Sequence, residues 1–202
     1  STNSYAFVPH IAGSGPNAIF QFKFDENTGH LTPNSPAKVE PEEFLGPRHF
    51  CFHPSLDVLY FSNEQDCSVT GYRLDTGNGT LSAFQTITTL PEGYTERNTC
   101  SQIQVSASGR FLYAPNRGHD SIACFSIDTA TGQLTGNGIV GSEARPNALC
   151  LGPQDRFLYS AGQESGRMAS FSVNSDSGKL TPLETYPLGN APVWVSIIEL
   201  PG

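Results

Sequence analysis

One stretch decides the fold: Gly46-Pro47-Arg48-His49-Phe50-Cys51-Phe52-His53-Pro54. Aromatic and polar residues alternate within it, as in a β-strand whose side chains point to opposite faces. The Gly-Pro pair before the alternation is typical of a turn, and the final proline ends the strand because it cannot donate to a ladder. Arg48 and His49 are therefore expected where a strand emerges from a loop, with Asn63-Glu64 a short distance further along the chain.

This stretch opens the first complete copy of an internal repeat. Each copy contains a Leu-Tyr pair just before a polar turn, and the pairs recur at about 50-residue spacing. The copies are Leu59-Tyr60-Phe61-Ser62-Asn63, Leu112-Tyr113-Ala114-Pro115-Asn116 and Leu158-Tyr159-Ser160-Ala161-Gly162, with a weaker one at Ser4-Tyr5-Ala6-Phe7. Such a period is typical of a protein built from stacked, similar units.

Each copy continues into a second strand and then a hairpin turn. The second strands are predicted at Ala18–Phe24, Val69–Leu74, Ile122–Ile127 and Met168–Val173. The turns begin at Asp25, Asp75, Asp128 and Asn174, whose side chains can bond the turn backbone, and each contains a glycine for the positive φ. A further strand follows each turn. Four short strands per repeat predict an all-β protein, a β-propeller of four-stranded antiparallel blades without any long helix.

The count of strands has a peculiarity at the two ends. The first copy lacks its opening strand, and a lone strand is expected at Val193–Ile198. Together these make about four blades. Residues 1–202 are therefore interpreted as a single β-propeller domain or as part of one. Because a four-bladed ring would have a narrow centre, we expect an open arc of blades whose end faces carry exposed apolar residues and favour self-association.

Composition excludes several classes of protein. Acidic residues outnumber basic ones 19 to 11, which gives a net charge of −8, so nucleic acid is not an expected partner. No apolar run reaches 18 residues and no signal peptide is visible, so no membrane partner is expected. Five cysteines, none in a C-x-x-C pair, indicate reduced thiols and a cytoplasmic protein.

No cofactor or metal is expected either. His49, Cys51 and His53 lie on one face of the predicted strand, but the two histidines would be about 13 Å apart at ~3.3 Å per residue. Zinc ligands lie only about 2 Å from the ion, so these residues cannot share one. Phosphate-binding loops and serine-hydrolase motifs are also missing from the sequence.

The sequence resembles the 6-phosphogluconolactonase family of β-propeller lactonases, to which the carboxy-cis,cis-muconate lactonising enzyme is related. The motifs that carry the resemblance are Gly46–Pro54, Asn63-Glu64, Arg110-Phe111-Leu112-Tyr113, Asn116-Arg117-Gly118-His119-Asp120-Ser121-Ile122 and Gly189–Val195. The resemblance implies a seven-bladed ring with the substrate over its central channel, of which this chain matches the C-terminal four blades. Two positions depart from the family. The family usually has Pro-Arg where this chain has Pro146-Asn147, with Arg145 two positions before Asn147, and an acidic residue is common where this chain has Gln102.

On the family motifs, Arg48 and Arg117 are interpreted as ligands of an anionic lactone, since arginine holds an oxyanion bidentately. They are expected in one strand register of adjacent blades, facing one pocket. Lactone opening needs a base, and the candidates for catalysis are His49, Glu64 and His119, whereas Asp120 and Arg145 are further candidates for substrate binding. Alternatives stay open: Glu64 as a structural ion pair with Arg48, Asp120 as a turn former, and a solvated Arg48 beside a structural His49.

Three functions fit these residues. The first is hydrolysis of a sugar lactone, with 6-phosphogluconolactone to 6-phosphogluconate as the leading case and a small anionic lactone as the partner. The second is a lactonising isomerase that works the same ring chemistry on a muconate. The third is a non-catalytic propeller that binds a partner on one face.

Overall fold

The structure is a computed structural model that describes residues 4–198, and it consists of four antiparallel β-sheets. In these residues the only helical segment is a three-residue 3₁₀ turn, Pro153–Asp155, and no helix is long and apolar enough to cross a membrane. The strands are β1 (Tyr5–His10), β2 (Ala18–Phe24), β3 (Leu31–Val39), β4 (Pro47–Phe52), β5 (Val58–Asn63), β6 (Ser68–Asp75), β7 (Thr80–Thr88), β8 (Gln104–Val105), β9 (Phe111–Asn116), β10 (Ser121–Ile127), β11 (Leu134–Gly141), β12 (Pro146–Leu151), β13 (Phe157–Gly162), β14 (Arg167–Val173) and β15 (Leu180–Pro187).

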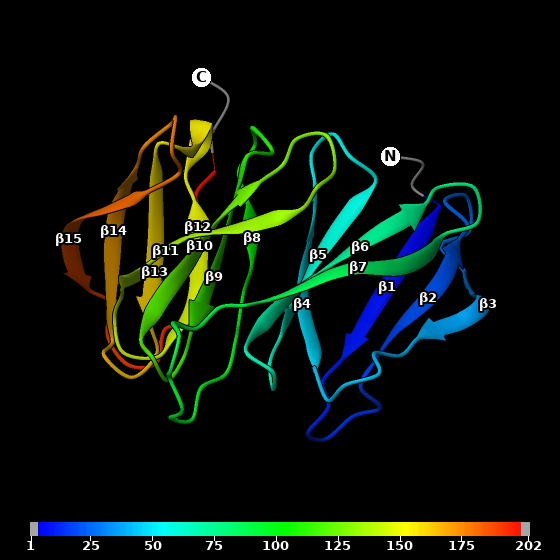
Figure 1. The fold of residues 1–202 in the computed structure, drawn as a ribbon, viewed down its shortest axis with the longest axis horizontal. Helices are drawn as coiled ribbons and strands as arrows, with labels where there is room; N and C mark the ends of the chain where they lie inside the picture. The colour runs from blue at the N-terminus through cyan, green and yellow to red at the C-terminus, as the bar shows by residue number, and fades with distance from the viewer. Residues whose placement is uncertain (1–3, 199–202) are drawn as a thin grey trace.

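Each sheet is one blade whose strands follow one another in sequence order. The blades are β1-β2-β3, β4-β5-β6-β7, β8-β9-β10-β11 and β12-β13-β14-β15. The first sheet has three strands, which confirms that the first repeat lacks its opening strand. The first and last blades lie at opposite ends of the long axis, so the blades form an open arc, as expected (Figure 1).

The hydrophobic core lies between neighbouring sheets. On β5, Leu59 and Phe61 face the first blade, whereas Val58 and Tyr60 face the third, so the two-residue period buries both faces of the strand. A third cluster around Leu149 and Phe171 joins the last two blades. Each blade is therefore stabilised mainly by its neighbours, which explains why the strands of the middle blades read as nearly continuous apolar runs.

The repeated tyrosines tie each blade to the next. Tyr5 Oη donates to Thr76 O at 3.3 Å, Tyr60 Oη to Gly132 O at 2.7 Å, and Tyr113 Oη to Gly178 O at 2.8 Å. Every acceptor belongs to the hairpin turn of the following blade. The repeat motif recognised in the sequence is thus a joint between blades as well as a strand.

Glutamine amides form a second set of links between blades. The amide oxygens of Gln21, Gln85 and Gln102 accept hydrogen bonds from the backbone N–H of Leu81, Leu134 and Leu149 at 2.7, 2.7 and 2.9 Å. Gln102 is buried, with 9% of its surface exposed. A neutral amide satisfies this buried N–H without burying a charge, so Gln102 has a structural role here.

The prediction of a strand at Val193–Ile198 is wrong. The backbone after Pro187 is irregular as far as residue 198, and Val193, Trp194 and Ile198 are 59%, 65% and 72% exposed. A strand needs a ladder partner, but the nearest blade already has four strands and the three-stranded first blade lies at the far end of the arc (Figure 1). The β-forming residues of this segment therefore have nothing to pair with.

Candidate active site

The candidate site residues gather where strands of the second, third and fourth blades begin or end at loops. Arg48 is the second residue of β4, whereas Glu64 and Arg117 directly follow β5 and β9. The prediction that Arg48 and Arg117 share one strand register is therefore wrong. Arg117 corresponds to Glu64, and Arg48 corresponds to Asn147, because Pro47 pairs with the end of β5 as Pro146 pairs with the end of β13.

A carboxylate joins two arginines at the centre of the site. Glu64 Oε2 lies 2.7 Å from Arg48 Nε, and Glu64 Oε1 lies 2.9 Å from Arg117 Nη2. The side chains of Arg48, Glu64 and Arg117 are 26%, 18% and 9% exposed. Burial, followed by the charge of Arg117, lowers the pKa of Arg48, although a guanidinium stays charged in proteins. The arrangement holds two positive groups close together in a largely dehydrated place.

Arg117 is incompletely satisfied by the protein. Nη2 also donates to Cys100 O at 3.1 Å, and Nη1 reaches Asn147 Oδ1 only at 3.5 Å. The buried Nε has no hydrogen-bond partner among the described residues. A buried donor without an acceptor is costly, so this guanidinium retains capacity to bind an anion.

His49 lies beside this ion-pair cluster. Burial first, and then the charges of Arg48 and Arg117, lower its pKa to about 4, while Glu64 acts in the opposite direction. The ring is therefore neutral at neutral pH, the form that accepts a proton. Its position is fixed through the backbone, because Ser62 Oγ lies 3.3 Å from both His49 N and His49 O and donates to Ser101 O at 2.6 Å.

His119 lies on the next loop and has other partners. Its Nδ1 is 2.7 Å from Ser121 Oγ, and its ring meets Tyr94 edge to face with centroids 4.8 Å apart. Tyr94 comes from the connection 89–103 between β7 and β8, which is much longer than the connection between β11 and β12. This loop therefore places the Tyr94 ring against His119 at the edge of the site.

Asp120 and Arg145 bind each other through the backbone. Asp120 Oδ1 accepts from Arg145 N at 2.8 Å, a bond between residues 25 positions apart and therefore not the local turn cap that the sequence left open. The Arg145 side chain is 46% exposed and pairs with Glu164, itself 64% exposed, at 3.2 Å. Both residues are held at the boundary between the third and fourth blades, and the Arg145 guanidinium is accessible.

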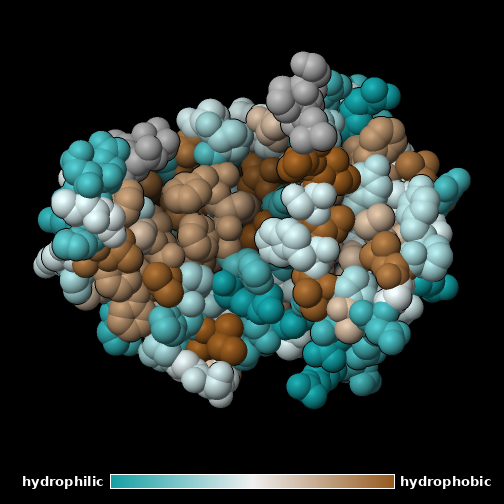
Figure 2. Space-filling view, turned by 180° about the vertical axis from the view of Figure 1, so that it is seen from behind, coloured by the Kyte–Doolittle hydropathy of each residue, from teal (hydrophilic) through white to brown (hydrophobic). Residues whose placement is uncertain are grey.

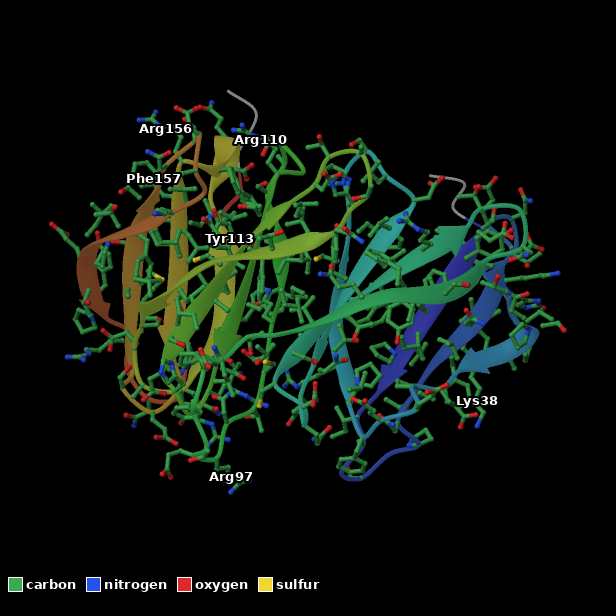
Figure 3. The ribbon with its side chains drawn as sticks, viewed as in Figure 1. Lys38, Arg97, Arg110, Tyr113, Arg156 and Phe157 are labelled. Carbon is green, nitrogen blue, oxygen red and sulfur yellow. The ribbon has the colours of Figure 1, made fainter. Side chains whose placement is uncertain are left out.

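A cavity of about 180 Å³ connects two of the predicted arginines. It is lined by Arg97, Asn98, Thr99, Arg117, Gly118 and Arg145. Arg97 projects from the lower end of the molecule, opposite the end that carries Arg110 and Arg156 (Figure 3). The structure thus brings Arg48, His49, Glu64 and Arg117 into one cluster, with Arg145 across a cavity from Arg117.

His53 is a structural residue. Its Nε2 lies 2.9 Å from Gly109 O, and its Nδ1 accepts from the backbone N–H of Ser55 and Leu56 at 3.2 and 3.0 Å. These bonds fix the ring between the second and third blades. Among residues 4–198 no group of three or more His, Cys, Asp or Glu side chains is placed to hold a metal ion.

Sequence reasoning missed Asn98. Its Oδ1 accepts from the backbone N–H of Gly118 and His119 at 2.8 and 3.1 Å, and its Nδ2 donates to Asn116 Oδ1 at 3.0 Å. One buried amide therefore shapes the turn that carries Arg117 and His119. The greater length of this repeat was the only signal in the sequence that pointed to the loop containing Asn98.

Radially arranged four-stranded antiparallel sheets define the class of β-propellers. Residues 3–197 match the model of the family described as "Lactonase, 7-bladed beta-propeller", and the chain belongs to that family.

Relatives and solved structures agree with this assignment. The chain is 33% identical over 173 residues to a 6-phosphogluconolactonase of Pectobacterium carotovorum (86% of this chain, 52% of the relative). It is 32% identical over 198 residues to one of Erwinia tasmaniensis (98% and 58%). The structure of the periplasmic gluconolactonase of Pseudomonas aeruginosa superposes with a TM-score of 0.85 at 28% identity, covering 93% of this chain and 52% of that one. The chain thus spans about half the length of the curated relatives it matches.

Proposed function

We propose that the protein hydrolyses a sugar lactone, with 6-phosphogluconolactone as the first candidate substrate and 6-phosphogluconate as the product. The observation that carries the proposal is the Arg48–Glu64–Arg117 cluster beside a neutral His49. An anionic lactone needs fixed positive charge, and ring opening needs a proton acceptor near it. The family and the names of the curated relatives support the same reaction.

In this proposal His49 is the base. A water molecule attacks the lactone carbonyl carbon while His49 takes its proton, and the carbonyl oxygen becomes an oxyanion. Arg48 and Arg117 stabilise that oxyanion, which is where preorganised charge lowers the barrier most. The bond from the carbonyl carbon to the ring oxygen then breaks, and the protonated His49 returns its proton to the departing oxygen. The products are a carboxylic acid, which ionises, and a hydroxyl group.

Glu64 and His119 have supporting roles in this scheme. Both oxygens of Glu64 are engaged by arginines, so it is better suited to orienting the two guanidinium groups than to taking a proton. His119 is engaged by Ser121 and Tyr94, which leaves it at the side of the site. We assign Glu64 as a positioning residue and place His119 in the wall that contacts the sugar.

We also propose a cytoplasmic location. All five cysteines are free, and four of them are buried. Free thiols are usual in reducing compartments, whereas exported proteins generally form disulfides.

A hydrolysis assay tests the function. 6-phosphogluconolactone and glucono-δ-lactone should each be followed at slightly acid pH, where spontaneous opening is slow, with wild type, Arg48→Ala, His49→Gln and Arg156→Ala. Arg156 lies at the opposite end of the molecule, so its replacement is the matched control (Figure 3). We expect Arg48→Ala and His49→Gln to lose about 10²-fold or more in kcat/KM, as for a lost general base or charge donor. Unchanged rates in both variants would refute this site.

A further inference from the structure

Positive charge is concentrated at one small cavity in an acidic protein. The chain carries a net charge of −8, yet three of its eleven basic residues, Arg97, Arg117 and Arg145, are among the six residues that line the 180 Å³ cavity. None of the six is acidic. Three carboxylates contact these residues from outside the lining: Glu64 pairs with Arg117, Glu164 pairs with Arg145, and Asp120 accepts from the backbone N–H of Arg145. The cavity therefore presents cations without a carboxylate of its own.

The walls of this cavity are set by backbone. A Cβ added to Gly118 would lie 2.1 Å from Arg97 O, so the loop 89–103 packs directly on the bare glycine. The amide of Asn98 locks the same contact by accepting from the backbone N–H of Gly118. A side chain at Gly118 would push this loop away, so the present shape depends on the glycine.

Arg117 and Arg145 differ in a way that suits a shared ligand. The Arg117 side chain is nine-tenths buried and keeps an Nε without a partner among the described residues, with only a long contact from Nη1. The Arg145 side chain is 46% exposed and pairs with the exposed Glu164. Exposed ion pairs contribute little and exchange readily, so Arg145 can turn to an anion that Arg117 already holds.

We propose that this cavity binds the phosphate group of a phosphorylated lactone, while the ring lies over Arg48, His49 and Glu64. The inference rests on the proposed function and deepens it. Typical ligand pockets measure about 300–1,000 Å³, so a cavity of 180 Å³ suits one compact anionic group better than a whole sugar acid. Arg117 contacts both regions, because Nη2 binds Glu64 while the residue also lines the cavity.

Arg145 then determines specificity. It lies outside the Arg48–Glu64–Arg117 cluster, so its charge is available to a phosphate and not to the lactone carbonyl. Charge-assisted hydrogen bonds contribute about ten- to a hundredfold in affinity. The presence of Arg145 would therefore favour a phosphorylated lactone over its unphosphorylated counterpart by that factor.

Binding of two reaction products, 6-phosphogluconate and gluconate, tests the phosphate site independently of catalysis. 6-phosphogluconate and gluconate differ only by the phosphate, and their binding can be measured by titration calorimetry without any turnover. In wild type we expect 6-phosphogluconate to bind at least tenfold more tightly. Arg145→Ala should remove most of that difference and leave gluconate binding unchanged, Arg145→Lys should retain part of it, and Arg156→Ala should match wild type.

Several outcomes overturn the proposal. They are equal binding of the two products, no detectable binding of 6-phosphogluconate at millimolar concentration, or an equal loss of both in Arg145→Ala. Circular dichroism establishes that each variant is folded. If lactone hydrolysis is absent while 6-phosphogluconate still binds selectively through Arg145, the proposed function fails and the phosphate site stands. If hydrolysis occurs but both lactones respond alike to Arg145→Ala, the phosphate site fails alone.

Discussion

Glu64 and Arg117 bind each other at 2.9 Å across the boundary between two blades, from corresponding positions of their repeats. The repeat thus places opposite charges at equivalent strand ends, and the charges meet at the centre of the arc. Because the pair is largely buried, it is both a structural contact and the base of the candidate site.

Removing Glu64 from its ion pairs with Arg48 and Arg117 should lower the free energy of unfolding. Glu64→Gln leaves Arg48 and Arg117 close together without a counter-charge, and breaking a buried pair costs about 3–5 kcal/mol. We expect the lower part of that range, since Glu64 is 18% exposed. Urea denaturation measures the loss, and Glu40→Gln, which breaks the exposed pair of Lys38 and Glu40, should cost less than about 1 kcal/mol. Equal losses in the two variants would show that burial does not matter here.

His49 predicts a pH dependence of stability. Its pKa is about 4 in the folded protein and near the ordinary 6.5 in the unfolded chain, so the unfolded state binds the proton first as pH falls. The contribution of the neutral ring is therefore fully present above about pH 6.5 and decreases as pH falls toward 4. Denaturant midpoints of wild type should fall more between pH 7 and 4.5 than those of His49→Gln. Parallel curves for the two proteins would contradict the lowered pKa.

The same pKa predicts the pH profile of hydrolysis. If His49 is the base, kcat/KM should stay level from pH 7 down to about 5 and decline only near 4. A stopped-flow assay in a series of buffers of constant ionic strength measures this. A decline centred near the ordinary histidine value would assign the base to another residue.

Asn98→Ala should impair the site more than the fold. It removes the acceptor for the N–H groups of Gly118 and His119, so the turn carrying Arg117 loses its support. We expect an increase of about tenfold in KM and a loss of about 1–3 kcal/mol in stability. Asn98→Asp keeps the acceptor and should recover KM in part. If KM is unchanged in Asn98→Ala, the amide has only a structural role.

The tyrosine joints offer a matched pair of substitutions. Tyr113→Phe removes the buried bond to Gly178 O and should destabilise the chain by about 1 kcal/mol or more. Tyr159 occupies the corresponding place in the last blade but lines an open cavity with Phe157 and Leu183, so Tyr159→Phe should be nearly neutral. Thermal unfolding compares the two, and a similar shift in both would refute the joint.

The open arc predicts association. Leu183, Tyr186 and Phe157 on the last blade are 52%, 39% and 36% exposed, an apolar face of the kind that the other blades bury. Apolar surface is also visible across the middle of the back of the molecule, with hydrophilic residues toward its lower right (Figure 2). Sedimentation of this chain should show species larger than 21.7 kDa, and Leu183→Lys should reduce them. A single species of monomer mass at micromolar concentration would contradict this prediction.

Local sequence predicted the strands because their pattern is local. The predicted strand Ala18–Phe24 coincides with β2, since alternation and the following Asp25 turn define both its faces and its end. The segment Val193–Ile198 has the same kind of composition, yet it is irregular because a strand also needs a partner that composition cannot supply. The correspondence of Arg117 with Glu64 was missed because it depends on which strand of a blade comes first. Asn98 was missed because its three hydrogen-bond partners come together only in the folded chain.

The tyrosine joints also give the array of blades a polarity. Every joint runs the same way, from a tyrosine of one blade to the turn of the next, and both ends of the series are unfilled. In the turn of the first blade, nothing lies within 4 Å of a Cβ built on Gly29, whereas a Cβ built on the equivalent Gly79 of the second blade would meet the ring of Tyr5. At the other end, Tyr159 has no turn opposite it among the described residues. One end of the array is therefore a donor and the other an acceptor. Two copies joined by a further contact of this kind would meet head to tail, a contact that either closes into a ring or continues as a filament.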